Sequence, residues 1–203
     1  MSSGEDWEGL DLISWLGDLN RELLARVDLA TPDAFRDSRV TAEVVAAGWL
    51  GSPGASDDEI RDVGAGLGTA LPPGYRSFLQ ASDGFLLPGL IVPRLRSAGE
   101  LRWLRDEDPE TVATWAEYAE PGSVESELDG CLQISDRELV GTAVYLLNPA
   151  RRHGEEWEAV HLAHWSPGAE SFPSFRQLLV EERRRFAGHL GTTRVVRRGG
   201  PLC

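Results

Sequence analysis

Glycine spacing in one segment is the first pattern that could bind a phosphate group. Gly64, Gly66 and Gly68 alternate with other residues, as in a glycine-rich phosphate loop. Such a loop needs its glycines between a strand and the N-terminus of a helix, where backbone N–H groups and the helix dipole face the phosphate. Here the pattern places the glycines at the end of a helix. We therefore expect no nucleotide or other cofactor at this segment.

The histidines and cysteines form no recognisable metal or nucleophile motif. His161 and His164 lie three residues apart in a predicted strand, where side-chain alternation points them to opposite faces. His153 and His189 come from a loop and a helix end, and neither completes a zinc-binding spacing. Cys131 follows an apolar pattern that is typical of a buried, unreactive thiol. We predict no catalytic residue, no metal site and no enzyme; only a carboxylate pair brought together by the fold would escape this argument.

Acidic residues gather in one segment that contains no arginine. The ten carboxylates between residues 106 and 136 are Asp106, Glu107, Asp108, Glu110, Glu117, Glu120, Glu125, Glu127, Asp129 and Asp136. Uncompensated charge on an inserted helix and loop creates a local potential that can steer a basic partner. We predict partner binding at six of them, namely Asp106, Glu107, Asp108, Glu110, Glu117 and Glu120. The alternative is a solvated surface that only keeps the protein soluble.

The overall composition supports a folded acidic protein. The 203 residues carry 33 acidic and 20 basic side chains, a formal net charge of −13, and every basic residue is arginine. This balance disfavours nucleic acid and anionic membranes as partners and favours a basic protein. Two cysteines cannot build a disulfide framework. No signal-peptide pattern or apolar stretch of about 20 residues is present, so we expect a cytoplasmic protein.

Helical periods and caps predict the elements that would position these side chains. Apolar residues from Trp7 to Val27 recur at three- and four-residue steps: Trp7, Leu10, Ile13, Leu16, Leu19, Leu23 and Val27. This helix is expected to pack on its own domain, and a homodimer through it is the alternative. A capping box at Ser56–Glu59 starts a helix over 57–67, and Pro72 or Pro73 starts another over 73–82.

The remaining chain predicts an antiparallel sheet. Short runs of branched and aromatic residues at 85–92, 131–134, 140–147 and 157–165 are bounded by Pro, Gly and Asp, which is typical of strands. A helix beginning at Asp108-Pro109 is expected to bury Val112, Trp115 and Tyr118, and a closing helix is expected over 172–186. The predicted fold class is therefore α+β, with a central antiparallel sheet flanked by helices.

Several of these segments together resemble the SUKH superfamily, which includes fungal cell-wall-assembly regulators and bacterial immunity proteins. The resemblance covers about residues 45–187 and is carried by a capped helix, a Leu-Pro helix start, a Tyr and Phe-Leu pattern, an Asp-Gly turn and a closing Ser-Phe helix. The matching residues include Trp49, Gly51, Leu71, Pro72, Tyr75, Phe78, Leu79, Asp83, Gly84, Asn148, Pro149, Trp157, Ser171 and Phe172. Asp83 stands where the family often has asparagine, and both tolerate a turn.

The resemblance implies an α+β fold around an antiparallel sheet and carries no catalytic residue over to this chain. It favours an immunity protein of the bacterial branch that neutralises a toxin of the nuclease or deaminase class by direct binding. A regulatory scaffold in a cytoplasmic complex is the second interpretation, and a small-molecule binder or enzyme is the third. We divide the chain into an N-terminal helical extension (1–40), a SUKH-like domain (41–187) and a basic flexible tail (188–203).

Overall fold

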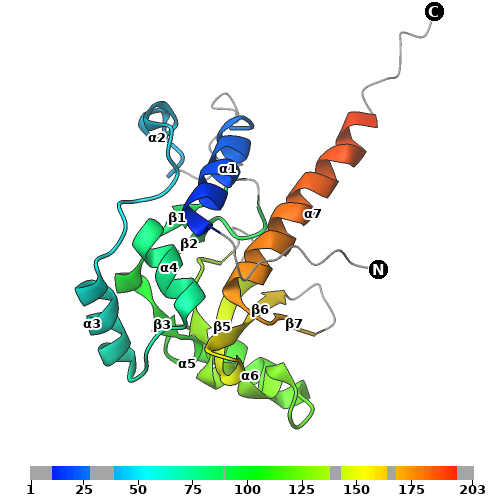
Figure 1. The fold of residues 1–203 in the computed structure, drawn as a ribbon. Coiled ribbons are helices and arrows are strands. Elements are labelled where there is room, and N and C mark those ends of the chain that lie inside the picture. Colours follow the sequence, from blue (N-terminus) through cyan, green and yellow to red (C-terminus); the bar gives the residue numbers. More distant parts are fainter. Residues whose placement is uncertain (1–10, 28–38, 89, 138–142, 164–167, 196–203) are drawn as a thin grey trace, which may run out of the picture.

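The computed structural model describes residues 11–27, 39–88, 90–137, 143–163 and 168–195, with side chains to residue 187. Seven α-helices lie within these ranges (Figure 1): α1 (Leu12–Leu24), α2 (Ala42–Ala47), α3 (Asp57–Leu67), α4 (Pro73–Ala81), α5 (Leu104–Glu107), α6 (Pro109–Tyr118) and α7 (Phe175–Val195). Two 3₁₀ helices, η3 (Ala98–Glu100) and η4 (Val124–Gly130), connect them to the strands.

The strands form two antiparallel sheets, which confirms the predicted α+β class. The main sheet has the order β3-β4-β5-β6-β7, in which neighbouring strands are also consecutive along the chain. Its strands are β3 (Arg102–Trp103), β4 (Leu132–Gln133), β5 (Ala143–His153), β6 (Glu156–Ala163) and β7 (Glu170–Phe172). A small second sheet pairs β1 (Phe85–Leu86) with β2 (Arg94–Leu95). Only two residues of the run 85–92 and two of 131–134 are strand, so these strands are shorter than predicted.

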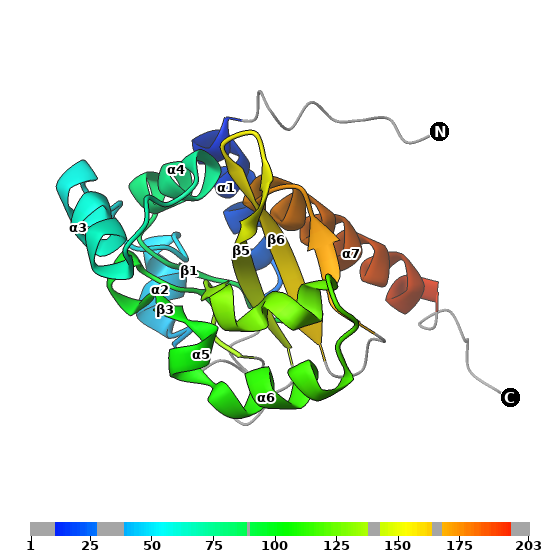
Figure 2. The same cartoon turned by 90° about the horizontal axis from the view of Figure 1, so that it is seen from below.

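The long hairpin of β5 and β6 supplies side chains to two separate cores. Tyr145 and Leu147 on β5 belong to the larger core, and Val144 and Leu146, which alternate with them, belong to the smaller one. This is the period of two that a pleated strand imposes. Helices α1, α4 and α7 cover the first face, whereas α5, α6 and η4 cover the second (Figure 2). A sheet covered on both faces explains why the β5 sequence reads as a continuous apolar run.

Strand β5 continues past Pro149, where the sequence predicted its end. The pairing between β5 and β6 shifts register between Asn148 and Arg152, and Arg152 then pairs with Trp157. A proline cannot donate to the ladder and is tolerated at such a bulge. The side-chain oxygen of Asn148 accepts a hydrogen bond from the backbone N–H of Ala150 at 3.0 Å, which supports the bulge. The irregularity therefore accommodates the proline without ending the strand.

Helices α3 and α4 begin where the sequence predicted. Ser56 and Glu59 form the reciprocal capping box of α3, and Gly68 ends that helix in the left-handed conformation at φ 74°. Gly64 and Gly66 therefore lie within α3 and Gly68 directly follows it, as expected. Pro73 opens α4, whose Tyr75 and Phe78 are fully buried. The Phe78 ring lies 5.6 Å from Tyr75 and 5.2 Å from Phe175 of α7, so α4 and α7 share one aromatic cluster.

Helix α1 packs into the larger core of the same domain. Leu16, Leu19 and Leu23 are buried there, together with Leu12. Ile13 is 69% exposed, so the predicted apolar stripe was wrong at this position because Leu12 takes its place in the core. The stripe residues Trp7 and Leu10 lie outside the described residues. The core is continuous between α1 and the later elements, and the predicted division at residue 40 does not separate two cores.

The closing helix starts later and ends later than predicted. Phe172 belongs to β7 and not to the helix, because Ser171 and Phe172 pair with β6. Helix α7 runs from Phe175 to Val195, past the predicted start of a flexible tail at residue 188. The arginines at 183–185 therefore lie in mid-helix, where no C-terminal dipole favours them. Arg183 instead pairs with Glu22 of α1, and residues 196–203 lie outside the described part of the chain.

A buried polar cluster anchors α7 to the sheet. Glu182 of α7 is only 2% exposed and accepts a hydrogen bond from the Tyr145 hydroxyl at 2.6 Å and from Arg185 at 3.0 Å. His161 of β6 lies beside it, with 3.6 Å between its Nδ1 and a Glu182 oxygen. Burial and the neighbouring Glu182 raise the pKa of Tyr145, which therefore remains a hydrogen-bond donor. This cluster fixes the register of α7 along the sheet because a buried carboxylate needs its partners.

Asp136 joins segments that are far apart in the sequence. Its carboxylate pairs with Arg39, with Arg94 at 3.0 Å and with Arg96 at 3.4 Å. Arg94 also makes two hydrogen bonds, of 2.8 and 2.9 Å, to Glu100. Burial alone raises the pKa of Asp136, but the hydrogen bonds from Arg94 and Arg39 outweigh it and hold that pKa at about 2. The same balance holds the pKa of Glu100 at about 2.

Replacing Phe78 by alanine should lower the free energy of unfolding by about 3–5 kcal/mol, because a buried ring loses both its transfer energy and its packing. The measurement is urea denaturation followed by tryptophan fluorescence. Ile13→Ala is the control, because this exposed side chain should change stability by no more than about 0.5 kcal/mol. Equal losses in the two variants would contradict the burial described for α4.

Stability should fall in acid through the Asp136 cluster. The folded pKa of Asp136, about 2, lies below the unfolded value, so its contribution is present above about pH 4 and is lost as the pH falls towards 2. Asp136→Asn should lower the free energy of unfolding by about 2 kcal/mol at pH 7. The difference in this free energy between the variant and the unmodified protein, the stability gap, should close near pH 2. Denaturation at several pH values measures this gap, and a gap that stays constant down to pH 2 would contradict the assignment.

Candidate functional site

The predicted binding residues divide into two groups in the structure. Glu107 at the end of α5 pairs with Arg96 at 2.8 Å, and Asp108 pairs with Arg137. Asp108 also accepts a hydrogen bond from the Thr111 backbone N–H and so caps α6. Both carboxylates are already engaged inside the protein. The prediction that these two charges are uncompensated was wrong, because arginines from outside the acidic segment reach them.

Other carboxylates of the segment also have internal partners. Glu127 accepts hydrogen bonds from Arg151 at 2.8 Å and from Asn148 at 2.7 Å. Arg151 is the main cause of the lowered pKa of Glu127. Burial raises the pKa of Glu125, but the hydrogen bond that it accepts from the Ala169 backbone N–H at 2.7 Å, together with further hydrogen bonds and the charge of Arg151, lowers that pKa on balance. With Asp136, these residues hold the insertion on the domain, and the ten charges are not all uncompensated.

Four of the six predicted carboxylates are exposed and have no partner in another element that the structure describes. Glu110, Glu117 and Glu120 make no side-chain hydrogen bond or ion pair with any residue that the structure describes, and Asp106 approaches only its neighbour Arg105, at 3.9 Å. Glu110 and Glu117 are seven residues apart on α6, so they lie on the same side of the helix. The opposite side of α6 packs on the smaller core through the partly buried Val112 and Trp115.

Tyr118 adds a large aromatic side chain to this exposed surface. The sequence predicted that it would be buried with Val112 and Trp115, but its ring is 77% exposed. Tyr118 is the last residue of α6, and the chain leaves the helix there instead of covering the ring. We call Asp106, Glu110, Glu117, Glu120 and Tyr118 the acidic face. The sequence could not show that Tyr118 belongs to the acidic face, because the helical period places Tyr118 on the side of the helix that faces the core.

The acidic face lies away from the helices that cover the larger core. Helices α5 and α6 lie on one side of β5 and β6, and α1 and α4 lie on the other (Figure 2). Exposed charge around an aromatic side chain is a composition that protein interfaces use, because the ring supplies buried area and the charges supply orientation. The arrangement suits recognition of a basic surface.

The side chains considered for other chemistry have structural environments. Cys131 is fully buried, and burial raises the pKa of its thiol to about 12, so it is not an activated nucleophile. His161 faces Glu182 beneath α7, and burial lowers its pKa. His164 lies outside the described residues. Within the described ranges, no group of three or more His, Cys, Asp or Glu side chains is placed to share a metal ion.

Comparison with known proteins adds no family assignment: the chain matches no protein-family model and no curated protein. Among the helices of the described ranges, none combines the length and apolar character that crossing a membrane requires.

Asp108 and Glu117 should differ in their effects on stability. Asp108→Ala removes the cap of α6 and an ion pair, and should lower the free energy of unfolding by about 1–2 kcal/mol. Glu117→Gln, on the exposed side of the same helix, should change it by no more than about 0.5 kcal/mol. Urea denaturation of both variants measures the difference. A cost at Glu117 as large as that at Asp108 would mean that Glu117 is structural and not part of a free surface.

Proposed function

We propose that the protein is a non-catalytic binding module whose acidic face engages a basic surface on a protein partner. The observation that carries this proposal is the coincidence of carboxylates without internal partners and a 77% exposed tyrosine on one helix. Glu107 and Asp108 flank the same helix but are neutralised, so the free charge is concentrated at the remaining positions.

The carboxylates of the acidic face and the ring of Tyr118 would contribute differently to binding. Exposed carboxylates at the edge of an interface mainly raise the association rate and the dependence on salt, because their field acts over about a Debye length. An aromatic residue that becomes buried at the centre of an interface slows dissociation and contributes most of the affinity. We therefore expect neutralisation of the carboxylates and removal of the Tyr118 ring to change different rate constants.

The more specific proposal is an immunity protein that covers the basic groove of a toxin of the nuclease or deaminase class. Its support is the resemblance to the SUKH superfamily, together with the sign of the acidic face. A groove that binds nucleic acid is positively charged, and an exposed acidic helix is complementary to it. A cytoplasmic location belongs to this proposal and is supported by the content of only two cysteines.

The alternative of a regulatory scaffold rested on the apolar side of the N-terminal helix. Leu16, Leu19 and Leu23 of α1 are buried in the domain itself, so these three side chains do not lie on its surface. The exposed Ile13 is a single apolar side chain, and isolated exposed apolar residues are common on soluble proteins. No feature of the described residues favours the scaffold over the toxin antagonist.

The test compares binding by the unmodified chain and two variants. The first variant carries Asp106→Asn, Glu110→Gln, Glu117→Gln and Glu120→Gln, and the second carries Tyr118→Ala. Each is immobilised and exposed to native lysate at low and high salt, and the retained proteins are identified and then purified for kinetics. We expect a basic partner whose association with the first variant is about tenfold slower at low salt, and whose dissociation from the second is about tenfold faster.

The matched control carries four neutralised carboxylates away from the acidic face: Asp18→Asn, Glu43→Gln, Asp62→Asn and Glu155→Gln. All four are exposed, so this control has the same net charge as the first variant. It should retain nearly normal association. If the control slows association as much as the first variant, the overall charge and not the acidic face steers the partner. If a folded first variant binds normally, the acidic face is not the interface.

A further inference from the structure

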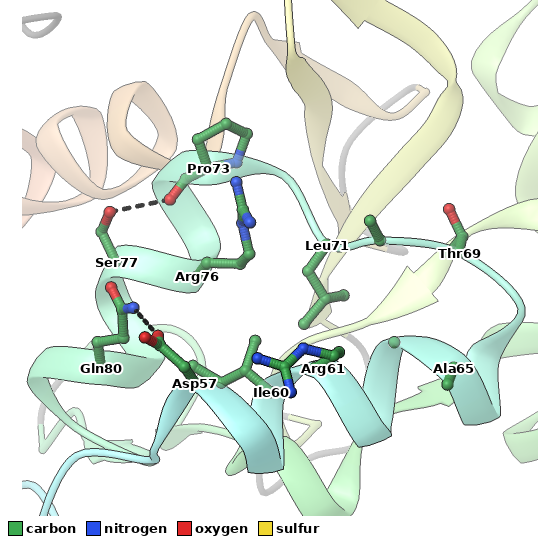
Figure 3. A pocket seen from close by; sticks show the side chains of 12 residues that line it. Asp57, Ile60, Arg61, Ala65, Thr69, Leu71, Pro73, Arg76, Ser77 and Gln80 are labelled. Carbon is green, nitrogen blue, oxygen red and sulfur yellow. Dashed lines mark hydrogen bonds between the residues drawn. The ribbon is translucent and has the colours of Figure 1, made fainter.

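A second surface of opposite chemistry lies between α3 and α4. A groove of about 640 Å³ opens there (Figure 3), and the buried side chains of Ile60 and Leu71 form its apolar floor. Arg61 of α3 and Arg76 of α4 line it from the two helices. Both arginines are exposed, as is Ala65 on the α3 side. We call this hollow the α3–α4 groove.

Arg76 is distinguished from the other arginines by its lack of partners. Every other arginine whose side chain the structure describes makes an ion pair, a hydrogen bond or a ring contact. The Arg76 side chain makes none with any described residue. In a chain with a formal net charge of −13, carboxylates are plentiful, and the other arginines find them or other partners. A cation without a partner in this acidic protein is available to an anion from outside.

No polar group that lines the groove pairs with the Arg76 side chain among the described residues. Asp57, the acidic residue in its lining, accepts a hydrogen bond from Gln80 across the two helices (Figure 3). Arg61 pairs with Asp58 one turn away, but the two side chains are 69% and 82% exposed. Such an exposed pair contributes little and exchanges readily with another carboxylate. Arg61 on α3 and Arg76 on α4 thus each offer a guanidinium group to a ligand in the groove.

Small residues keep the groove open. A Cβ atom at Gly64 would lie 2.8 Å from the carbonyl oxygen of Thr69, so the end of α3 can approach the following loop only with glycine there. Ala65 and Ala70 line the space without filling it. The groove thus combines an aliphatic floor, a rim of small side chains and two cations, which together suit an aliphatic group next to a carboxylate.

We propose that the α3–α4 groove docks an acidic segment of a protein partner, with a carboxylate on Arg76 and aliphatic side chains on Ile60 and Leu71. The exposed rim favours a peptide over a small molecule, because small-molecule sites bury most of their ligand. Grooves between helices commonly take such segments. Helix α4, which lines the groove, and helix α6, which carries most of the acidic face, lie on opposite sides of β5 and β6 (Figure 2), so the two surfaces can be tested independently.

The probe is an acetylated, amidated eight-residue peptide made of leucine and glutamate in alternating pairs. Its titration into the ¹⁵N-labelled protein should shift the amide signals of Ile60, Ala65, Leu71 and Arg76 most strongly. Arg76→Gln should weaken binding by about tenfold or more, the loss expected for a hydrogen bond to a charged group. Ala65→Glu, which places a like charge on the exposed side of α3, should abolish binding without opening a cavity in the core.

Three controls make the result specific. Arg102→Gln removes an exposed arginine on β3 that donates only to the carbonyl groups of Gly99 and Leu101, and it should leave binding unchanged. The glutamine analogue of the peptide should bind at least about tenfold more weakly. Hexanoate, a small aliphatic anion, should bind more weakly than the peptide. The proposal is overturned by no binding at millimolar peptide, by equal binding of the glutamine analogue or of Arg76→Gln, or by hexanoate binding as tightly as the peptide.

Discussion

The alternation of side chains along the β5–β6 hairpin is the constraint on which the other elements depend. Neighbouring residues such as Leu146 and Leu147 lie in different cores, so the hairpin can be buried only if helices cover both faces of the sheet. Helices α1, α4 and α7 meet this need on one face, and the inserted segment of α5, α6 and η4 meets it on the other. The acidic face lies on the outer surface of this inserted segment.

This constraint explains why the acidic segment has two kinds of carboxylate. Glu125 and Glu127 attach the inserted segment to the sheet through Ala169 and Arg151, and Asp108 caps helix α6 of that segment. A segment that must be held in place uses part of its charge for that purpose. Only carboxylates on the far side, such as Glu110 and Glu117, remain available to a partner. Their number is smaller than the sequence indicated, but the same helix also exposes the aromatic side chain of Tyr118.

The sequence predicted local features well and long-range pairing poorly. The capping box at Ser56 and the proline start of α4 depend on contacts within a few residues, and the structure confirms them. The antiparallel class followed from the pattern of short apolar runs and is also confirmed. The pairing of Asp136 with Arg39 joins residues 97 positions apart, and no local pattern indicates it. The exposure of Tyr118 and Ile13 has the same origin, since helical period shows which side chains share a side but not where the neighbouring element ends. The α3–α4 groove likewise requires two helices in place.

The unequal lengths of the strands limit how a partner can bind. The outer strands of the main sheet, β3 and β7, have two and three residues, whereas β5 and β6 inside it have eleven and eight. The described edges therefore present few free N–H and C=O groups on which another chain could build an additional strand. This architecture discourages both edge-to-edge self-association and recognition by strand addition. Side chains on the helices outside the sheet, including those of the acidic face, then offer the larger surface on which selectivity for a partner can be encoded.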